Sequence, residues 1–375
     1  MKVGIDCRLW NQTGVGRYIC NLVTNLALID KKNEYVLFVR SQDEKEFKIQ
    51  NSKFKIVRAD VRWHSVEEQV RLPGILSEQN LDLMHFPYFS VPILYNKPFI
   101  VTIHDLIVNR FNTGRASTLP FPLYFAKRIG YHAVLSNAVY RSKKIIVPSN
   151  AVRVNLLRTY PRINSEKVEV TYEGGFGPLT ALRVSEVRNE KLVEGRYLLR
   201  VGNFYPHKNV EGLLLAFNEF LYDNYQNHDV KLVLVGKRDY FSKRITKQIK
   251  KLNIGTNVIF LENATDEDLV LLYSNATATI IPSFEEGFSL TAVEALGCGS
   301  PLIASDIPVH REICGNVAVY CNPFDTNDIK QKISFVFSLV ESSRKELVDQ
   351  GKRQAKKFSW EKMAEQTLSV YNSLD

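Results

Sequence analysis

Short apolar runs alternate with segments of helical periodicity along this chain, and this pattern restricts the fold more than any other feature. In the first half the runs are typical of strands, at residues 2–6, 34–39, 54–59, 83–86, 99–105 and 144–149. Between them, residues 16–29 and the segment from Pro120 to Asn137 have helical spacing. Strands that alternate with helices predict a parallel sheet built from strand-helix-strand units.

A second series of the same kind begins at Tyr197. Its strands are expected at residues 197–203, 230–236, 258–262, 278–283, 301–305 and 317–322. Its helices are expected at 209–221 and 266–276, and an amphipathic helix follows at 360–374. We therefore expect an α/β protein with two doubly wound parallel-sheet domains that face a central cleft, where ligands bind beyond the carboxyl ends of the strands.

The length and the composition set the domain bounds and the broad class. At 375 residues the chain is too long for one ordinary core. Between the two series the periodicity fades and Gly and Pro accumulate, at Gly174, Gly175, Gly177 and Pro178. We expect an N-terminal domain over 1–173, a linker over 174–196, a second domain over 197–355, and a helix over 356–375 that crosses back to the first domain.

Nothing in the sequence predicts a membrane span or a secreted protein. Hydrophobic content of 45% and charged content of 24% are typical of a soluble globular chain. The start, MKVGIDCRLW, is typical of a strand rather than a signal peptide, because Asp6 and Arg8 interrupt its apolar stretch. Five scattered cysteines fit core positions in a reducing compartment. We expect a cytoplasmic protein.

The net charge of +9 is unevenly distributed. Residues 1–180 hold 25 Lys and Arg against 15 Asp and Glu, and residues 106–165 hold ten basic residues and no acidic one. Basic and aromatic residues mix in the segment 121–134, which suits an anionic membrane surface or a pyrophosphate-bearing acceptor. A solvated face over core aromatics explains the segment equally well. We expect no nucleic acid, because no recognition motif accompanies the charge.

The stretch 282–306, PSFEEGFSLTAVEALGCGSPLIASD, follows an expected strand. Ser289 is expected to N-cap a helix over 290–296 that ends at Gly297. The backbone N–H groups at such a helix start attract anions. Glu294 lies one turn inside the helix, where its carboxylate can bind a ribose diol, and Glu286 lies before it. Spacing alone equally allows Glu294 to stabilise the helix and Glu286 to be solvated.

Two further motifs suggest contacts to phosphate. Lys208 lies in VGNFYPHKN, between a strand and a helix, and can reach phosphate oxygens unless it is only a solvated surface lysine. Gly14 and Gly16 follow the first strand and allow a close backbone approach to a diphosphate, or form a simple tight turn. Their spacing differs from GxGxxG, which disfavours a dinucleotide site.

Histidines mark the first domain. His104 and Asp105 end a strand, where a histidine can act in base chemistry or be a buried structural residue, and no serine or cysteine nucleophile motif accompanies them. His85 is as compatible with packing as with an acceptor contact. The sequence contains no DxD, HExxH or CxxC motif, so we expect no metal site and no cofactor.

These motifs together resemble family 4 glycosyltransferases, retaining enzymes of the GT-B fold with two Rossmann-like domains. Residues 282–305 are similar to the family's glutamate-x7-glutamate signature, and 201–209 to its phosphate-lysine motif. Residues 4–18, 82–92 and 101–106 resemble the N-terminal glycine loop and the strand ends of the acceptor domain. The resemblance runs the whole chain. The glutamate signature with the lysine motif is fairly specific, whereas the N-terminal loop alone is weak.

The resemblance implies a role for each of these residues. It implies that Glu286 binds the donor sugar, that Glu294 holds the ribose, and that His104 contacts the sugar near the reacting centre. His104, Glu286 and Lys208 form the expected catalytic set. The expected donor site comprises Gly14, Gly16, Asn203, Lys208, Glu286, Gly287, Phe288, Ser289, Leu290 and Glu294. The expected acceptor contacts are His85, Tyr88 and Arg17.

Asn203 departs from the family pattern, because many members have an arginine there that contacts the diphosphate. Asparagine supplies no charge, so diphosphate binding depends more on Lys208, the helix start and the N-terminal loop. Arg200, within a strand, and His207, expected to be exposed, are not predicted to replace that arginine.

The resemblance also implies an activity. We expect a retaining, metal-independent transfer of a sugar, with mannose from GDP-mannose favoured, to a lipid-linked pyrophosphate acceptor. The setting would be polysaccharide or O-antigen assembly at the inner membrane face. A front-face route, in which the departing phosphate takes the acceptor proton, needs no covalent carboxylate nucleophile. The alternatives are a UDP-sugar donor, a sugar-nucleotide epimerase, or a silent nucleotide-sugar-binding protein of the same fold.

Overall fold

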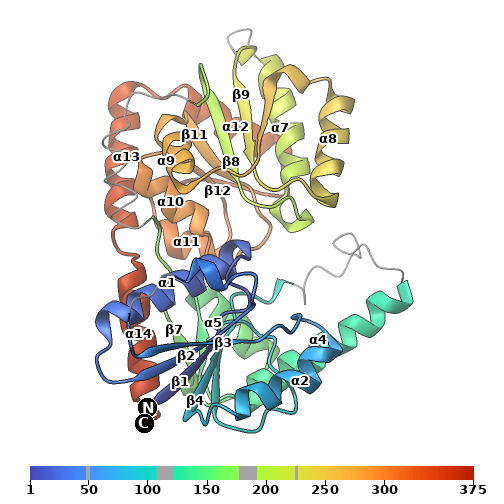
Figure 1. Ribbon diagram of the computed structural model, residues 1–375. Helices are drawn as coiled ribbons and strands as arrows, with labels where there is room; N and C mark the ends of the chain where they lie inside the picture. Colours follow the sequence, from blue (N-terminus) through green and yellow to red (C-terminus); the bar gives the residue numbers. More distant parts are fainter. Residues whose placement is uncertain (48–50, 108–120, 177–191, 224–226) are drawn as a thin grey trace. The chain divides into compact units, whose positions relative to one another are not determined.

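The computed structural model describes residues 1–47, 51–107, 121–176, 192–223 and 227–375, and these form two compact units (Figure 1). The first unit contains the chain up to Leu106, the segment from helix α4 (Phe121–Arg141) to Glu173, and Trp360–Asp375. The second contains the described residues between Gly174 and Ser359. The predicted linker over 174–196 falls largely on residues 177–191, outside the described residues, and the domain bounds stay a prediction.

The first unit is built on a seven-stranded parallel sheet with the order β3-β2-β1-β4-β5-β6-β7. Its strands pair in register around β1, with Val3 opposite Tyr35 on one side and Leu83 on the other. Because strand order reverses between β1 and β4, the carboxyl ends of these strands flank a topological switch point, where ligands bind in such sheets. The strands are β1 (Lys2–Asp6), β2 (Glu34–Val39), β3 (Phe54–Arg58), β4 (Leu83–Phe86), β5 (Phe99–Thr102), β6 (Ile145–Val147) and β7 (Val168–Val170).

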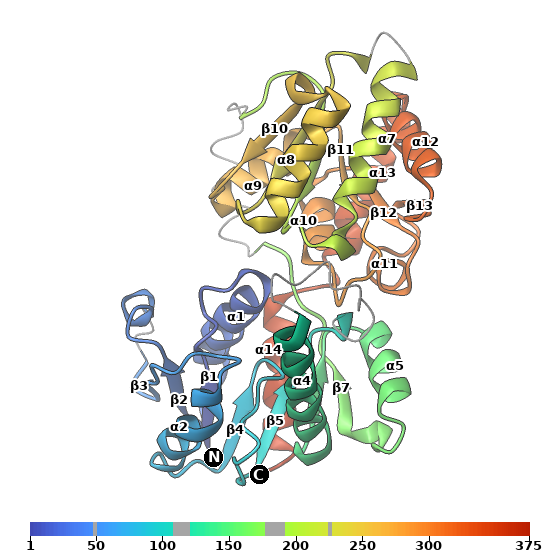
Figure 2. The same cartoon turned by 90° about the vertical axis from the view of Figure 1, so that its right-hand side faces the viewer.

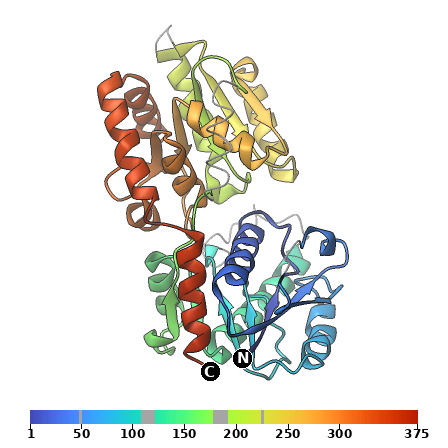
Figure 3. The ribbon, with the colours of Figure 1, turned by 60° about the vertical axis from the view of Figure 1, so that its left-hand side comes forward.

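Helices cover both faces of this sheet. On one face α1 (Thr13–Ile29) packs against α14 (Trp360–Asn372), the last helix of the chain (Figure 3). On the other face α4 lies with α2 (Val66–Ser77) and α5 (Asn150–Thr159) over a single hydrophobic cluster. The helix predicted from Pro120 to Asn137 is confirmed from Phe121 onward and extends to Arg141, whereas Pro120 lies outside the described residues.

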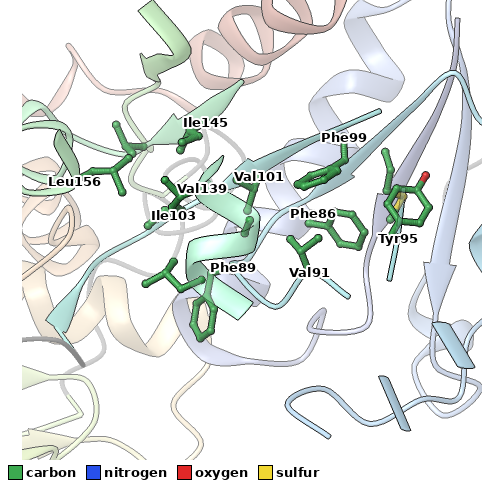
Figure 4. Close-up of a cluster of buried hydrophobic side chains, with 14 of the residues drawn as sticks. Phe86, Phe89, Val91, Tyr95, Phe99, Val101, Ile103, Val139, Ile145 and Leu156 are labelled. Carbon is green, nitrogen blue, oxygen red and sulfur yellow. The ribbon is translucent and has the colours of Figure 1, made fainter. Parts of the chain in front are cut away.

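Figure 4 shows the cluster on this second face, where alternate strand residues point toward the helices. Phe86 of β4 packs edge-on against both Tyr95 and Phe99, with ring centroids 5.7 Å apart in each pair. Leu156 from α5 and Val139 from α4 are also fully buried in it. Each such side chain contributes about 1.5–3 kcal/mol through removal from water, so this cluster fixes the strand ends that carry the polar residues described below.

The second unit has a six-stranded parallel sheet with the order β10-β9-β8-β11-β12-β13, which reverses between β8 and β11. Its strands pair in register on both sides of β8, with Leu199 opposite Val233 on one side and Thr279 on the other. The strands are β8 (Tyr197–Val201), β9 (Lys231–Val235), β10 (Val258–Leu261), β11 (Ala278–Ile281), β12 (Leu302–Ser305) and β13 (Val319–Cys321).

One face of the second sheet carries α7 (Val210–Asp223), α8 (Tyr240–Leu252) and α12 (Thr326–Phe337) over a common core (Figure 2). Around the second sheet, α10 (Leu290–Cys298) packs with α9 (Asp266–Asn275), α11 (Pro308–Cys314) and α13 (Glu341–Ala355). Both units therefore have the predicted doubly wound α/β architecture. The five cysteines are all free thiols, and Cys7, Cys314 and Cys321 are buried.

Candidate active site

The carboxyl edge of the second sheet brings the lysine motif and the glutamate motif together. β8 and β11 are adjacent and parallel, so the loops that follow them leave the sheet at the same edge. Lys208 ends a short 3-10 helix (Pro206–Lys208) after β8, and Glu286 follows β11. Nζ of Lys208 donates to Oε2 of Glu286 across 2.6 Å, although 78 positions separate the two residues.

This ion pair is largely shielded from solvent, with the Lys208 and Glu286 side chains 19% and 10% exposed. The second carboxylate oxygen of Glu286 accepts from the Ser283 hydroxyl at 2.7 Å. Burial alone would raise the pKa of Glu286, but the positive charge and the hydrogen bond of Lys208 outweigh it and hold the pKa at about 2. Glu286 is therefore a fixed carboxylate at neutral pH.

Asn209 fastens the lysine loop to the glutamate loop. Its backbone is left-handed, with φ of 53°, and its side-chain amide donates to the carbonyls of Pro282 at 3.1 Å and Pro323 at 2.7 Å. The Phe284 N–H donates to the His207 carbonyl at 2.8 Å. The bonds to Pro282 and from Phe284 join the lysine loop to the glutamate loop, whereas the bond to Pro323 joins Asn209 to the segment after β13.

Arg200, Asn203 and His207 occupy positions that differ in part from expectation. Arg200 is buried in β8, stacks 5.1 Å from the Phe204 ring, and donates to the carbonyls of Gly202 and Asn203. It thus braces the loop that contains Asn203. His207 was predicted to be exposed, which is wrong: it is half-buried, and burial together with Lys208 lowers its pKa to about 4.

The start of α10 also differs from the prediction. Ser289 is the residue before the helix, but its backbone is left-handed and its side chain makes no capping bond. Its hydroxyl instead lies 3.2 Å from Nε2 of His310. The helix continues through Gly297 to Cys298 and ends at Gly299, whose φ is 81°, so the predicted stop was two residues early. Only the left-handed residue at the helix end needs to be glycine.

Glu294 lies one turn inside α10, as predicted, and is buried. One of its carboxylate oxygens accepts from the Tyr273 hydroxyl at 3.1 Å. Of the other predicted donor residues, Phe288 is buried with its ring edge-on to Phe358 at 5.6 Å. Gly287 and Leu290 are half-buried beside it.

In the first unit His104 follows β5 and both its ring nitrogens are engaged. Nδ1 lies 3.1 Å from Oε1 of Glu173, and Nε2 lies 2.9 Å from the carbonyl of Pro87. Tyr18 packs edge-on against the ring at 4.9 Å. Burial disfavours the charged ring, but the hydrogen bond and charge of Glu173 outweigh it and raise the pKa of His104. A carboxylate and a carbonyl both require a donor, so this environment favours the imidazolium.

Glu173 and His310 were not predicted as site residues, although Glu173 contacts His104 and His310 contacts Ser289. Glu173 comes three residues after β7 and is buried, and His310 lies in α11 after β12 and is fully buried. The available signal was their position, because each follows the carboxyl end of a strand where polar side chains gather in such sheets.

His85 does not present a free ring atom to an acceptor. It lies on β4 and is fully buried, with Nδ1 2.7 Å from the Tyr371 hydroxyl and Nε2 2.8 Å from the Thr102 hydroxyl. Burial lowers its pKa to about 3. The packing alternative explains His85 in this structure, and we leave it out of the acceptor site. Of the other two expected acceptor contacts, Tyr88 and Arg17 are half-buried, and Tyr88 lies 6.4 Å from the His104 ring.

The N-terminal glycines lie in the first turn of α1 rather than in a loop before it. A Cβ on Gly16 would lie 2.1 Å from the carbonyl oxygen of Trp10, so close packing of the chain on itself requires this glycine. Gly14 is exposed and is the better placed of the two to approach a ligand.

The described ranges contain no group of three His, Cys, Asp or Glu residues that could hold a metal ion. Across the same residues, every helix is too short or too polar to cross a membrane.

Family comparisons agree with this arrangement of residues. A model described as Glycosyltransferase Family 4 matches residues 12–174, and one described as Glycosyl transferases group 1 matches residues 185–354. The chain belongs to glycosyltransferase family 4. The second match contains the Lys208–Glu286 pair, and the first contains His104 and Glu173.

Among relatives of this family 4 glycosyltransferase, "O-antigen chain mannosyltransferase B" of Escherichia coli is 25% identical over 96% of both chains. "O-antigen chain mannosyltransferase RfbU" of Salmonella typhimurium is 26% identical over 75% of this chain and 72% of its own. Sucrose-phosphate synthase from Thermosynechococcus elongatus superimposes with a TM-score of 0.77 at 19% identity, covering 100% of this chain and 99% of that one. WaaG, a glycosyltransferase involved in lipopolysaccharide biosynthesis, gives 0.74 at 14% identity and 99% and 99% coverage. These structures support the GT-B fold.

Proposed function

We propose that this glycosyltransferase moves a mannosyl group from GDP-mannose to a lipid-linked glycan acceptor, with retention of the anomeric configuration and without a metal ion. The observation that carries the proposal is the buried pair of Lys208 and Glu286, an ammonium and a fixed carboxylate held together at the carboxyl edge of the second sheet. The names of the two O-antigen relatives support mannose and a cell-surface glycan.

In the proposed donor complex Lys208 and Glu286 bind different parts of the ligand. The ammonium of Lys208 binds phosphate oxygens as a point charge, and the first N–H groups of α10 add donors to the same anion. The carboxylate of Glu286 accepts from sugar hydroxyls, and Glu294 accepts from the ribose. In this proposal donor binding exchanges the Lys208–Glu286 bond for two bonds to the ligand.

The proposed reaction breaks the bond between the sugar C1 and the phosphate oxygen, and forms a bond from C1 to the acceptor oxygen on the same face. The acceptor proton moves to the departing phosphate oxygen, so atoms and charge balance without a covalent enzyme intermediate. Lys208 and the α10 N–H groups stabilise the negative charge that develops on the diphosphate. His104, an imidazolium whose two N–H groups donate to Glu173 and to the Pro87 carbonyl, is proposed to stabilise the same transition state through its charge and not through a hydrogen bond.

The acceptor side of the proposal depends on the exposed face of α4 in the first unit. Phe125 and Ile129, one turn apart, are 56% and 58% exposed, and the half-buried Arg128, three positions after Phe125, lies on the same side of the helix. Aromatic and aliphatic side chains next to a basic residue are suited to an anionic membrane surface. We propose that this face holds the enzyme at the cytoplasmic side of the membrane, where lipid-linked acceptors lie.

A thermal-shift series with GDP, UDP, ADP and their sugars, with EDTA present, tests the donor. A ligand at 100 times its dissociation constant adds about 2.7 kcal/mol to the stability of the state that binds it. We expect GDP and GDP-mannose to raise the unfolding temperature. A shift with uridine nucleotides alone would replace GDP by UDP, and no shift with any nucleotide, with or without magnesium, would reject the Lys208–Glu286 region as a nucleotide-sugar site. A shift without any transfer to an acceptor would support the silent binding protein.

The stereochemistry needs a separate measurement on the product. We expect NMR of the new linkage to show the anomeric configuration of the donor. A glycosyl-enzyme trapped by rapid quench and mass spectrometry would contradict the front-face route. Turnover of the donor to an isomeric sugar nucleotide in the absence of acceptor would identify an epimerase.

A further inference from the structure

Ser289 has a backbone conformation that its own side chain does not stabilise. Its φ of 76° and ψ of 61° lie in the left-handed region, which residues with a Cβ rarely adopt. A serine before a helix usually accepts a bond from an N–H group of the first turn, and Ser289 makes no such bond. A neighbouring group must therefore hold this residue in place.

His310 is the neighbour that contacts the Ser289 side chain. Its Nδ1 lies 2.9 Å from the carbonyl oxygen of Ser305, which can only accept, so Nδ1 carries the proton. Burial lowers the pKa of His310, which leaves Nε2 as an acceptor in the neutral ring. The Ser289 hydroxyl, 3.2 Å away, therefore donates to Nε2. Because the hydroxyl is used in this way, it does not occupy the N–H groups at the start of α10.

The same histidine is connected to the Glu286 loop. The Ser305 hydroxyl lies 3.0 Å from Nδ1 of His310 and donates to the carbonyl of Ser283 at 2.5 Å. The Ser283 hydroxyl in turn donates to Glu286. His310 thus lies where two short chains of hydrogen bonds meet, one that leads to the helix start and one that leads to the carboxylate.

We infer that His310 is a positioning residue for the diphosphate end of the donor site, and that it acts by holding Ser289 in the left-handed conformation that leaves the first N–H groups of α10 directed at the phosphates. This inference rests on the proposed function, in which α10 binds the donor diphosphate. His310 itself needs no contact with the ligand.

Two substitutions at one position separate backbone positioning from direct contact. Ser289→Ala and Ser289→Gly both remove the hydroxyl, but glycine adopts the left-handed conformation without support. Calorimetric titration with GDP and with GMP measures the contribution of the terminal phosphate. We expect S289A to weaken GDP binding about tenfold, which is about 1.4 kcal/mol, with GMP binding changed much less. S289G should bind GDP several-fold more tightly than S289A.

His310→Ala should reproduce the GDP loss of S289A, and the double variant H310A/S289G should recover part of it. Ser338→Ala, at an exposed serine of the same unit, is the matched control. Equal losses in S289A and S289G would mean that the hydroxyl binds the ligand directly, and would overturn the inference. An unchanged ratio of GDP to GMP affinity in S289A would also overturn it, even if H310A does not fold. Absence of any nucleotide binding by the unsubstituted enzyme would instead reject the proposed function.

Discussion

Lys208 and Glu286 neutralise each other across 2.6 Å at the carboxyl edge of the second sheet. The two residues that are expected to bind opposite ends of a sugar diphosphate are thus each other's partner in this structure. Replacing one member of a buried ion pair lowers the stability of a protein more than replacing both, because the remaining charge is left without a partner. The pair therefore connects the stability of the second unit to the machinery of the proposed reaction.

We expect Lys208→Met to lower the free energy of unfolding of the second unit by about 1–3 kcal/mol, because it leaves Glu286 unpaired. Urea denaturation followed by circular dichroism measures the change. The double variant K208M/E286Q should recover part of the loss, while K208R, which keeps the charge, should lose little. A loss in the double variant equal to the sum of the losses in K208M and Glu286→Gln would show that the pair carries no coupling.

The pH dependence of the same pair has a defined sign. The folded pKa of Glu286 is about 2, below the ordinary value of 4.5, so its stabilising contribution is present above pH 4.5 and disappears as the pH falls toward 2. We expect the stability difference between the unsubstituted chain and Glu286→Gln to be on the order of 3 kcal/mol at neutral pH. Urea unfolding at pH 6, 4 and 3 should show this difference shrinking, and a difference that stays constant would contradict the low pKa.

In the first unit the dependence of stability on pH, through His104, has the opposite sign. Glu173 raises the pKa of His104 above 6.5, so the contribution of His104 is fully present below that pH and is lost as the pH rises through the folded pKa. We expect Glu173→Gln to lower the pKa of the His104 ring, because it removes the carboxylate charge that opposes burial and leaves only the Pro87 carbonyl and the charge of Asp105 to do so. Ring NMR titration measures the shift, with the exposed His228 as internal control. An unmoved His104 titration would remove Glu173 as the cause.

A substitution of Gly16 tests whether this glycine is required for packing of the chain or for the approach of a ligand. We expect Gly16→Ala to destabilise the first unit by about 1–3 kcal/mol, because the added Cβ would lie 2.1 Å from the Trp10 carbonyl oxygen. Gly130 on α4 is the matched control, since a Cβ there meets nothing within 4 Å and should stabilise the helix by about 0.5–1 kcal/mol. Thermal unfolding of both variants decides the matter, and a fully stable G16A would refute the packing explanation.

The α4 surface predicts membrane binding. We expect Phe125→Ser/Ile129→Ser to reduce sedimentation with liposomes that contain anionic lipid by several-fold, and high salt to weaken the binding of the unsubstituted enzyme. Phe335→Ser, at a phenylalanine of α12 that is 51% exposed, controls for loss of an exposed phenylalanine. Binding that is indifferent to lipid charge, salt and these side chains would remove α4 as a membrane surface.

Local patterns in the sequence predicted the last helix and all the described strands except β7, because burial periodicity repeats along each element. The three residues of β7 are too few to show a period. They also predicted the positions of Lys208, Glu286 and Glu294 after strands of the second sheet. They did not predict that Lys208 and Glu286 pair, that Glu173 holds His104, or that His310 takes the Ser289 hydroxyl. Each of these contacts joins separate elements, and spacing along the chain carries no information about a partner in another loop.

The return of α14 to the first unit has a consequence for synthesis. Tyr371 supplies the hydroxyl that completes the hydrogen bonds of the buried His85, and α14 covers α1. The ribosome makes the segment from Gly174 to Ser359 before it makes this helix. During synthesis the face of α1 that packs on α14 therefore stays uncovered, and His85 lacks the Tyr371 hydroxyl, until the last residues of the chain are made.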